Sequence, residues 1–223
     1  MSKRKSQKQI RREKVRAEKA RKKFMGYGAL GLVLVALVGF VLTQPPKAPP
    51  LDDARLASNP SIGLDTAKVT ITEFADFGCH ACQSWHDSGI KEAIFEKYGD
   101  DVQFVWKDFP VITARSPKAA EAGQCAFDQG MFWEYHDLLY ANAPAIDVDD
   151  LKQYAAELGL DTARFDACLD SGQNQEKAAQ SETEARRLGL PGTPAFLVNG
   201  TKLIGPPSFE TLVAAIDAAL AGE

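Results

Sequence analysis

Three stretches of the chain carry the apolar, β-branched pattern of strands. Residues 67–77 read "AKVTITEFADF" and residues 102–111 read "VQFVWKDFPV", and both are rich in Val, Ile, Thr and aromatic residues. In "TPAFLVNGTKLIG", residues 193–205, two short apolar runs flank Asn199-Gly200, the dipeptide that most strongly favours a two-residue hairpin turn. The pattern therefore predicts two buried strands followed much later by a hairpin.

Helical spacing fills the remaining folded sequence. We expect a helix over "WHDSGIKEAIFEKYG", ending at Gly99, and a last helix over "SFETLVAAIDAALAG" with Ser208 as its N-cap. Between them, about residues 115–190 hold a run of amphipathic segments separated by Gly, Pro and Asp. The order strand, helix, strand, helical block, hairpin, helix predicts an α/β fold with a helical insertion.

Ahead of this region lies an apolar run without a charge, "FMGYGALGLVLVALVGFVL" at residues 24–42. As a helix it spans roughly 28 Å, close to the hydrocarbon thickness of a bilayer. A buried soluble helix or a cleaved signal peptide would share part of this pattern. The length of the run, and the lack of a small-x-small site in the following "TQPPKAPP", favour one retained transmembrane helix.

Charge is distributed unevenly on the two sides of this run. Residues 3–23 contain 12 of the 26 Lys and Arg and two acids, so the rest of the chain has a balance of −14. Because basic segments stay in the cytoplasm, residues 1–23 are expected there, and the sequence after the span outside it. Topology suffices to explain the basic segment, so we do not assign nucleic-acid binding to it. Prolines make residues 43–61 a linker, and residues 62–223 form the predicted folded domain.

Two cysteines follow the first predicted strand as Cys79-His80-Ala81-Cys82. A helix N-terminus carries partial positive charge and unpaired N–H groups, which favour a thiolate at Cys79. Cys82 lies about one turn further on the same face, where it can open or close a disulfide with Cys79. His80, in the first turn, is placed to stabilise the thiolate further. This arrangement favours disulfide exchange.

Metal binding and a purely structural disulfide are the alternatives for this pair. Zinc sites use the same spacing but need four ligands, and the other cysteines, Cys125 and Cys168, stand far apart. His80 and His86 are conceivable partners in a soft-metal site. We favour redox chemistry and expect no metal and no cofactor, since the cysteine pair is itself the redox group.

Other residues are candidates for supporting roles. Thr193-Pro194 begins the hairpin, where a proline is often cis and the Thr193 backbone is available to an extended peptide; an ordinary strand-entry proline is the alternative. Glu73, in the first strand, is predicted either to point beneath the disulfide as a proton acceptor or to be a solvated strand residue. His136, among aromatic residues of a helix, is expected to serve packing.

The motifs "TEFADFGCHAC", "FVWKDFPV", "FWEYHDLLY", "FDACLDSG" and "LGLPGTPAFLVNG" together resemble the DsbA-like thioredoxin family of membrane-anchored bacterial thiol–disulfide oxidoreductases. The resemblance covers about residues 60–220. It implies a thioredoxin fold with an inserted helical domain and oxidation of exported proteins. It also implies an attacking Cys79, a resolving Cys82, a cis-proline loop at Thr193-Pro194 and a buried acid at Glu73.

The resemblance has further implications for location and partners. It implies an enzyme of the bacterial inner membrane whose catalytic domain is extracytoplasmic. Unfolded or reduced exported proteins would be its substrates, and a quinone-linked membrane protein of the DsbB or VKOR type would reoxidise it. A structural disulfide between Cys125 and Cys168 is similar to the family's arrangement, with separate buried thiols or a second redox relay as the other readings. A monomer is expected.

The dipeptide between the cysteines departs from the family, in which proline usually occupies the position of His80. Because these two residues tune thiolate stability, the direction of the redox reaction stays open. A reductase or isomerase fed by a membrane electron donor is the alternative within the class. Two alternatives belong to other function classes: a metallochaperone that uses the cysteine pair, and a non-catalytic binding module.

Overall fold

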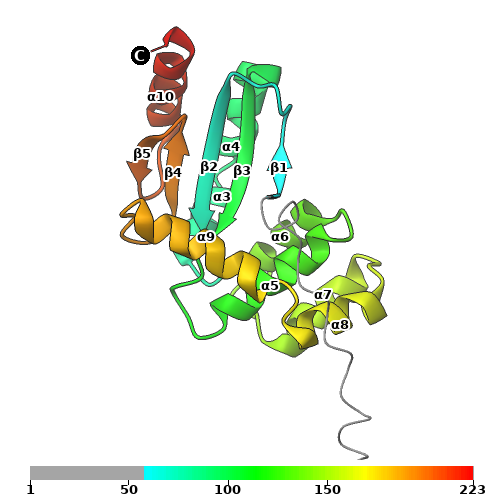
Figure 1. Ribbon diagram of the computed structural model, residues 1–223. Helices are drawn as coiled ribbons and strands as arrows, with labels where there is room; N and C mark the ends of the chain where they lie inside the picture. The colour runs from blue at the N-terminus through cyan, green and yellow to red at the C-terminus, as the bar shows by residue number, and fades with distance from the viewer. Residues whose placement is uncertain (1–57, 223) are drawn as a thin grey trace, which may run out of the picture. The chain divides into compact units, whose positions relative to one another are not determined.

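The computed structural model describes residues 58–222, and a five-stranded sheet forms the centre of this region (Figure 1). The strands follow the order β1-β3-β2-β4-β5, in which β2 and β3 are parallel and every other pair is antiparallel. Their bounds are β1 Ser61–Ile62, β2 Val69–Ala75, β3 Val102–Asp108, β4 Ala195–Val198 and β5 Thr201–Ile204. β2 is therefore the central strand, paired on both sides.

Alternation along β2 assigns its side chains to the two faces of the sheet. Val69 and Ile71 face the core built with helices α3 (His80–His86), α4 (Ile90–Tyr98) and α10 (Phe209–Ala221). Phe74 faces the opposite side, where it packs against Ala185 of helix α9 (Gln175–Arg187). In Figure 1, α9 crosses the front of the sheet while α4 lies behind it. Glu73 shares the α3 side with Ile71, because the two lie two positions apart along the strand.

Five helices lie between β3 and β4 in the described chain: α5 Ser116–Phe127, α6 Phe132–Ala141, α7 Val148–Glu157, α8 Thr162–Ser171 and α9. The first four gather beyond one end of the sheet (Figure 1). The α/β fold with a helical insertion is thus as the sequence predicts. The predicted hairpin turn at Asn199-Gly200 joins β4 to β5, and Ser208 caps α10 by accepting a hydrogen bond from the Thr211 N–H.

Two features differ from the sequence-based expectation. The single helix expected over residues 85–99 is two helices, because Gly89 adopts a φ of +72° and separates α3 from α4. A short turn of 3₁₀ helix, Gly99–Asp101, follows α4. The sequence analysis also missed strand β1, which is only two residues long and pairs with Val105 and Phe104 of β3.

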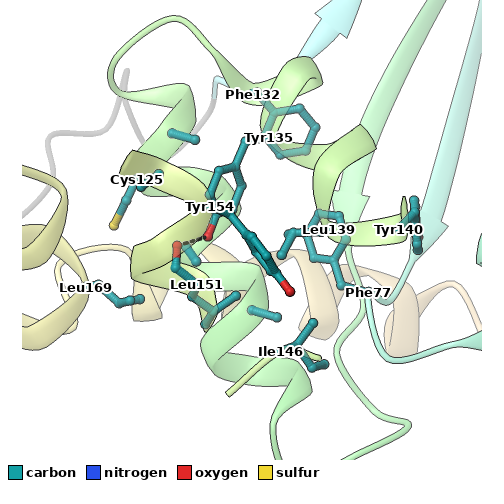
Figure 2. Close-up of a cluster of buried hydrophobic side chains, with 14 of the residues drawn as sticks. Phe77, Cys125, Phe132, Tyr135, Leu139, Tyr140, Ile146, Leu151, Tyr154 and Leu169 are labelled. Carbon is teal, nitrogen blue, oxygen red and sulfur yellow. Dashed lines mark hydrogen bonds between the residues drawn. The ribbon is translucent and has the colours of Figure 1, made fainter. Parts of the chain in front are cut away.

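The insertion has its own hydrophobic core, which is continuous with the region around the cysteine motif. Figure 2 shows Tyr135, Leu139 and Leu151 packed together, with the Tyr135 hydroxyl donating a hydrogen bond of 2.8 Å to the Leu151 carbonyl. Phe77, from the loop after β2, belongs to the same cluster and stacks on Trp106 of β3 at a centroid distance of 4.9 Å. The loop that carries the cysteines is therefore anchored in the insertion.

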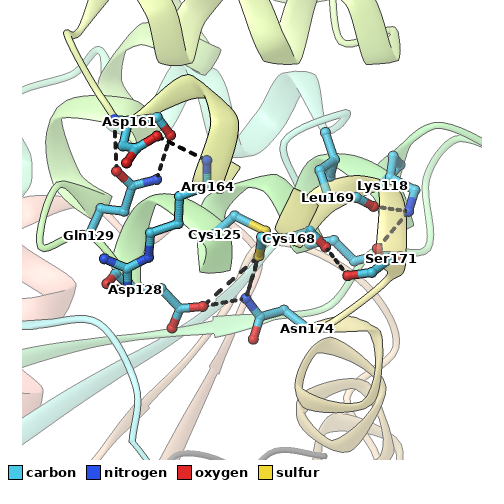
Figure 3. The surroundings of a disulfide bond; sticks show 11 residues. Lys118, Cys125, Asp128, Gln129, Asp161, Arg164, Cys168, Leu169, Ser171 and Asn174 are labelled. Atoms are coloured by element: carbon cyan, nitrogen blue, oxygen red, sulfur yellow. Dashed lines mark hydrogen bonds and ion pairs between the residues drawn. A yellow bond between two sulfur atoms is a disulfide. The ribbon is translucent and has the colours of Figure 1, made fainter. Parts of the chain in front are cut away.

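A disulfide joins Cys125 of α5 to Cys168 of α8 (Figure 3). The Asn174 side-chain amide donates to the Cys168 sulfur at 3.3 Å and to the Asp128 carboxylate at 2.9 Å. The bond ties together two helices of the insertion that are 43 residues apart in the sequence.

The predicted transmembrane helix at residues 24–42, the basic segment and most of the linker lie outside the described residues. Within residues 58–222, none of the helices combines the length and apolar character needed to cross a bilayer.

Removing the disulfide between Cys125 and Cys168 should destabilise the domain. Closure of a loop of 43 residues restricts the unfolded chain by about 4 kcal/mol in the chain-entropy model. We expect the Cys125→Ala/Cys168→Ala double variant to lose about that free energy of unfolding, and roughly 8–16 °C in melting temperature. Denaturant unfolding of both proteins, each with Cys79 and Cys82 reduced, measures the difference. An unchanged free energy would mean that the bridge does not stabilise the fold.

Candidate active site

The loop between β2 and α3 fixes where the cysteine helix begins. The Asp76 carboxylate accepts hydrogen bonds of 2.7 Å from the N–H groups of Gly78 and Ile112, and the Asp76 carbonyl accepts one from the Cys79 N–H. Gly78 passes so close to Ser116 that a β-carbon would lie 2.7 Å from its hydroxyl oxygen. Cys79 then occupies the N-cap position of α3, as its place after the strand predicts.

Both cysteines of the motif are free thiols, and their environments differ. Cys79 is 6 % exposed, and its pKa is lowered from 9.0 to about 5. The largest cause is the hydrogen bond with the Cys82 side chain; burial opposes it, and Thr193 and the backbone of Cys82 and Ala81 add to the lowering. Cys79 is therefore ionised at neutral pH, as the helix position suggests.

Cys82 has the opposite preference. It is fully buried, and burial raises its pKa above the ordinary value, followed by the hydrogen bond to Cys79 and the charge of Glu73. The pair thus consists of one sulfur that favours the thiolate and one that favours the thiol. This asymmetry gives the two sulfurs different roles as leaving groups.

Glu73 lies in the middle of β2, paired with Trp106 on one side and Phe196 on the other. Its side chain is 3 % exposed, and its pKa is raised to about 8; burial is the main cause, Lys91 opposes the shift and Cys79 adds to it. The sequence left open whether Glu73 is a buried proton acceptor or a solvated strand residue. In the structure it is buried, and its carboxyl is electrostatically coupled to Cys82.

Thr193 and Pro194 lie directly beside the pair. The peptide bond between them is cis, and the Cys79 Sγ lies 3.5 Å from the Thr193 carbonyl oxygen. Thr193 and Pro194 lie close to Cys79 because β4, which starts at the next residue, pairs with β2. His80, by contrast, is exposed, and its Nδ1 lies 3.4 Å from the Ser84 hydroxyl.

His86, considered above as a partner of the cysteines in a metal site, packs instead against the insertion. Its ring stacks on Tyr140 at 5.3 Å and meets His136 edge-on at 4.9 Å, both from α6. His136 is buried among aromatic rings, as the sequence predicts, and burial lowers its pKa to about 4. The metallochaperone alternative therefore loses His86 as a ligand.

The loops that line the site beside α3 were not predicted from the sequence. Two surface cavities adjoin the cysteine helix. One is lined by Phe77, Gly78, Cys79, His80, Gln83, Ala143 and Pro144. The other is lined by His80, Ala81 and Trp85 of α3 and also by Pro206 and Pro207. A hydrogen bond of 2.8 Å from Gln83 to the Tyr140 carbonyl holds α6 against α3. Only Pro144 in "ANAPAID" and the adjacent prolines of "GPPS" could have indicated these loops.

A family model described as thioredoxin matches residues 56–218, and the chain belongs to this family. A solved thioredoxin-like oxidoreductase from Silicibacter pomeroyi is 26 % identical, with a TM-score of 0.66 over 77 % of this chain and 99 % of that one. The α-DsbA1 structure of Wolbachia pipientis has the same fold, with 21 % identity, a TM-score of 0.65 and coverage of 74 % of this chain and 92 % of that one. The chain is thus a thioredoxin-family protein with a Cys-x-x-Cys pair, and its thioredoxin fold with a helical insertion, predicted from the sequence, is the fold of the DsbA structures.

The chain also resembles part of a longer protein. The Na(+)/H(+) antiporter NhaA of Herminiimonas arsenicoxydans is 34 % identical over 182 residues, which cover 82 % of this chain. The match covers 28 % of the antiporter, so this chain spans little more than a quarter of the curated relative's length.

The ionisation of Cys79 is directly measurable in the reduced protein. Thiolate absorbance at 240 nm should titrate with a midpoint near pH 5, and the step should vanish in Cys79→Ser. The same shift stabilises the folded dithiol form: its contribution is complete above pH 9 and is lost as the pH falls through about 5. A single midpoint near pH 9 would contradict the low pKa.

Proposed function

We propose that this protein oxidises the cysteines of exported, unfolded proteins by dithiol–disulfide exchange at Cys79 and Cys82. The observation that carries the proposal is the lowered pKa of Cys79 beside the raised pKa of Cys82. A stabilised Cys79 thiolate favours the reduced form of the enzyme, and an enzyme whose reduced form is stabilised is a strong oxidant.

The reaction starts from the oxidised pair. A substrate thiolate attacks the Cys79 sulfur, the Cys79–Cys82 bond breaks, and Cys82 leaves with the bonding electrons. A second substrate thiolate then attacks the substrate sulfur of the mixed disulfide, and Cys79 leaves as a thiolate. The substrate gains one disulfide, and the enzyme gains two electrons. The low pKa of Cys79 accelerates the last step, because a stabilised thiolate is the better leaving group.

Glu73 supports this cycle as a proton donor and acceptor. When Cys82 leaves in its buried position, it takes up a proton because its pKa is raised. Glu73, with a pKa of about 8, is mostly protonated at neutral pH and is electrostatically coupled to both cysteines. On reoxidation the same carboxylate accepts the proton from Cys82.

The surroundings of Cys79 suit an extended polypeptide. Thr193 precedes the cis-proline at a strand entry, where its backbone is available for β-augmentation by a substrate. The apolar cavity containing Phe77 and Pro144 lies beside the same sulfur and would receive side chains next to the substrate cysteine. His80 borders both cavities, and we propose that it tunes the thiolate and contacts the substrate.

We further propose that the enzyme is a monomer held in the bacterial inner membrane by residues 24–42. The basic residues 3–23 then stay in the cytoplasm, and the catalytic domain is extracytoplasmic. A quinone-linked membrane protein of the DsbB or VKOR type would reoxidise the pair. Two electrons per substrate disulfide have to leave the enzyme, and its described residues offer no further redox group beyond the buried structural bridge.

Substitution of each cysteine tests the roles. Cys79→Ser should abolish oxidation of a reduced, unfolded substrate, since the Cys79–Cys82 disulfide can no longer form. Cys82→Ser, which lacks the resolving thiol, should accumulate mixed disulfides when mixed with an oxidised peptide, and these are visible on non-reducing gels. The Cys125→Ala/Cys168→Ala variant is the matched control and should remain active below its melting temperature. Full activity of both single variants would refute the assignment.

The reduction potential decides the direction. Equilibration with glutathione buffers should give a value near the roughly −120 mV of strong oxidases rather than the roughly −270 mV of thioredoxin-type reductases. His80→Pro restores the usual residue and reports how far this position moves the potential. A value near −270 mV would favour the reductase or isomerase fed by a membrane electron donor.

A further inference from the structure

We propose that His86, His136 and Asp137 form a binding site for a divalent transition-metal ion of the Zn²⁺ type, at the contact between α3 and α6. This site lies outside the cysteine pair and goes beyond the sequence analysis, which predicts no metal. It is independent of the redox function proposed above.

The positions of the three ligand atoms carry the proposal. One donor atom from each residue lies within 4.8 Å of the other two. The His136 Nδ1 is 2.8 Å from an Asp137 carboxylate oxygen, and the His86 Nε2 is 3.6 Å from that same oxygen. Around a tetrahedral zinc with bonds of about 2.0–2.1 Å, neighbouring ligand atoms are about 3.3 Å apart. Small side-chain shifts therefore suffice to close the site.

The donor set selects the class of ion. Two imidazole nitrogens and one carboxylate oxygen suit Zn²⁺, Cu²⁺ or Ni²⁺, whereas Ca²⁺ and Mg²⁺ prefer oxygen ligands throughout. In the metal-free protein the His136 Nδ1–H donates to the Asp137 carboxylate. Coordination replaces this hydrogen bond, with the ring proton on Nε2 and the Nδ1 lone pair on the metal.

Packing holds the histidines in place, and solvent reaches the site. His136 is 2 % exposed, and its ring lies edge-on to Trp106 and Tyr140, each at a centroid distance of 4.9 Å. The Asp137 side chain is 56 % exposed, which provides an entry path and room for a water ligand. His86 completes the set from the last turn of α3. The ion would thus connect the cysteine helix to the insertion.

One charge opposes a cation here. Lys91 of α4 interacts electrostatically with all three residues, and its Nζ lies over the Trp133 ring at 4.9 Å. Asp87 and Glu92 act on His86 with the opposite sign. Lys91 therefore limits the affinity, so its removal should strengthen metal binding rather than weaken it.

Zinc titration of the full-length protein tests the site. The Cys79–Cys82 pair is first oxidised so that its thiolates cannot bind the metal. Calorimetry should then show one Zn²⁺ per chain, and Zn²⁺ should raise the melting temperature. His86→Ala and Asp137→Asn should each weaken binding by about tenfold or more. His80→Ala is the matched control, since the chain has three histidines and this one lies outside the site; it should bind as the wild type does.

A charge test separates this site from non-specific binding. Lys91→Met should tighten Zn²⁺ binding, whereas Lys97→Met, which removes an exposed charge from the same helix, should leave it unchanged. The proposal is overturned if the oxidised wild type binds no Zn²⁺ at tenfold molar excess, or if His86→Ala and Asp137→Asn retain wild-type affinity. Loss of binding in His80→Ala alone would likewise overturn it and place the ion elsewhere.

Discussion

Stabilisation of negative charge on one sulfur is the constraint on which the architecture around the cysteine motif depends. Cys79 has to lie at the N-cap of α3, where backbone groups and the Cys82 side chain favour its thiolate. The central strand β2 delivers the chain to that point, and the carboxylate of Asp76 fixes the turn. The pairing of β4 with β2 brings Thr193 to the same sulfur. The strand pairing that forms the sheet therefore also positions the groups that set the ionisation of Cys79.

The insertion contributes to this arrangement through the other side of α3. Gln83 bonds the end of α6, His86 packs between the aromatic rings of that helix, and Phe77 lies in the insertion's core. A helix of seven residues has little stability of its own in water. Its geometry therefore comes from the sheet on one side and from α6 on the other, which makes the insertion part of the active-site scaffold.

Short sequence motifs predicted several parts of the fold and of the candidate site. The cysteine spacing after a strand, the Asn199-Gly200 turn and the Ser208 cap each depend on a few adjacent residues, and the structure has all three in place. The break at Gly89 was missed because glycine is tolerated inside a helical pattern. The contact of α3 with α6 involves residues about 50 positions apart, and neither helical pattern identifies the neighbour it packs against. The burial of Glu73 was left open for the same reason. The alternation of residues along β2 shows which face of the sheet a side chain lies on, but not which helix covers that face.

The position of the Cys125–Cys168 bridge matters for the disulfide exchange proposed at the cysteine motif. Cys125 and Cys168 are 1 % and 6 % exposed, and the Asn174 side-chain amide lies against both sulfurs (Figure 3). A thiolate on a neighbouring copy therefore reaches this bridge less readily than it reaches Cys79, which lines a surface cavity. The framework disulfide of the insertion is thus shielded from the exchange chemistry proposed for the cysteine motif.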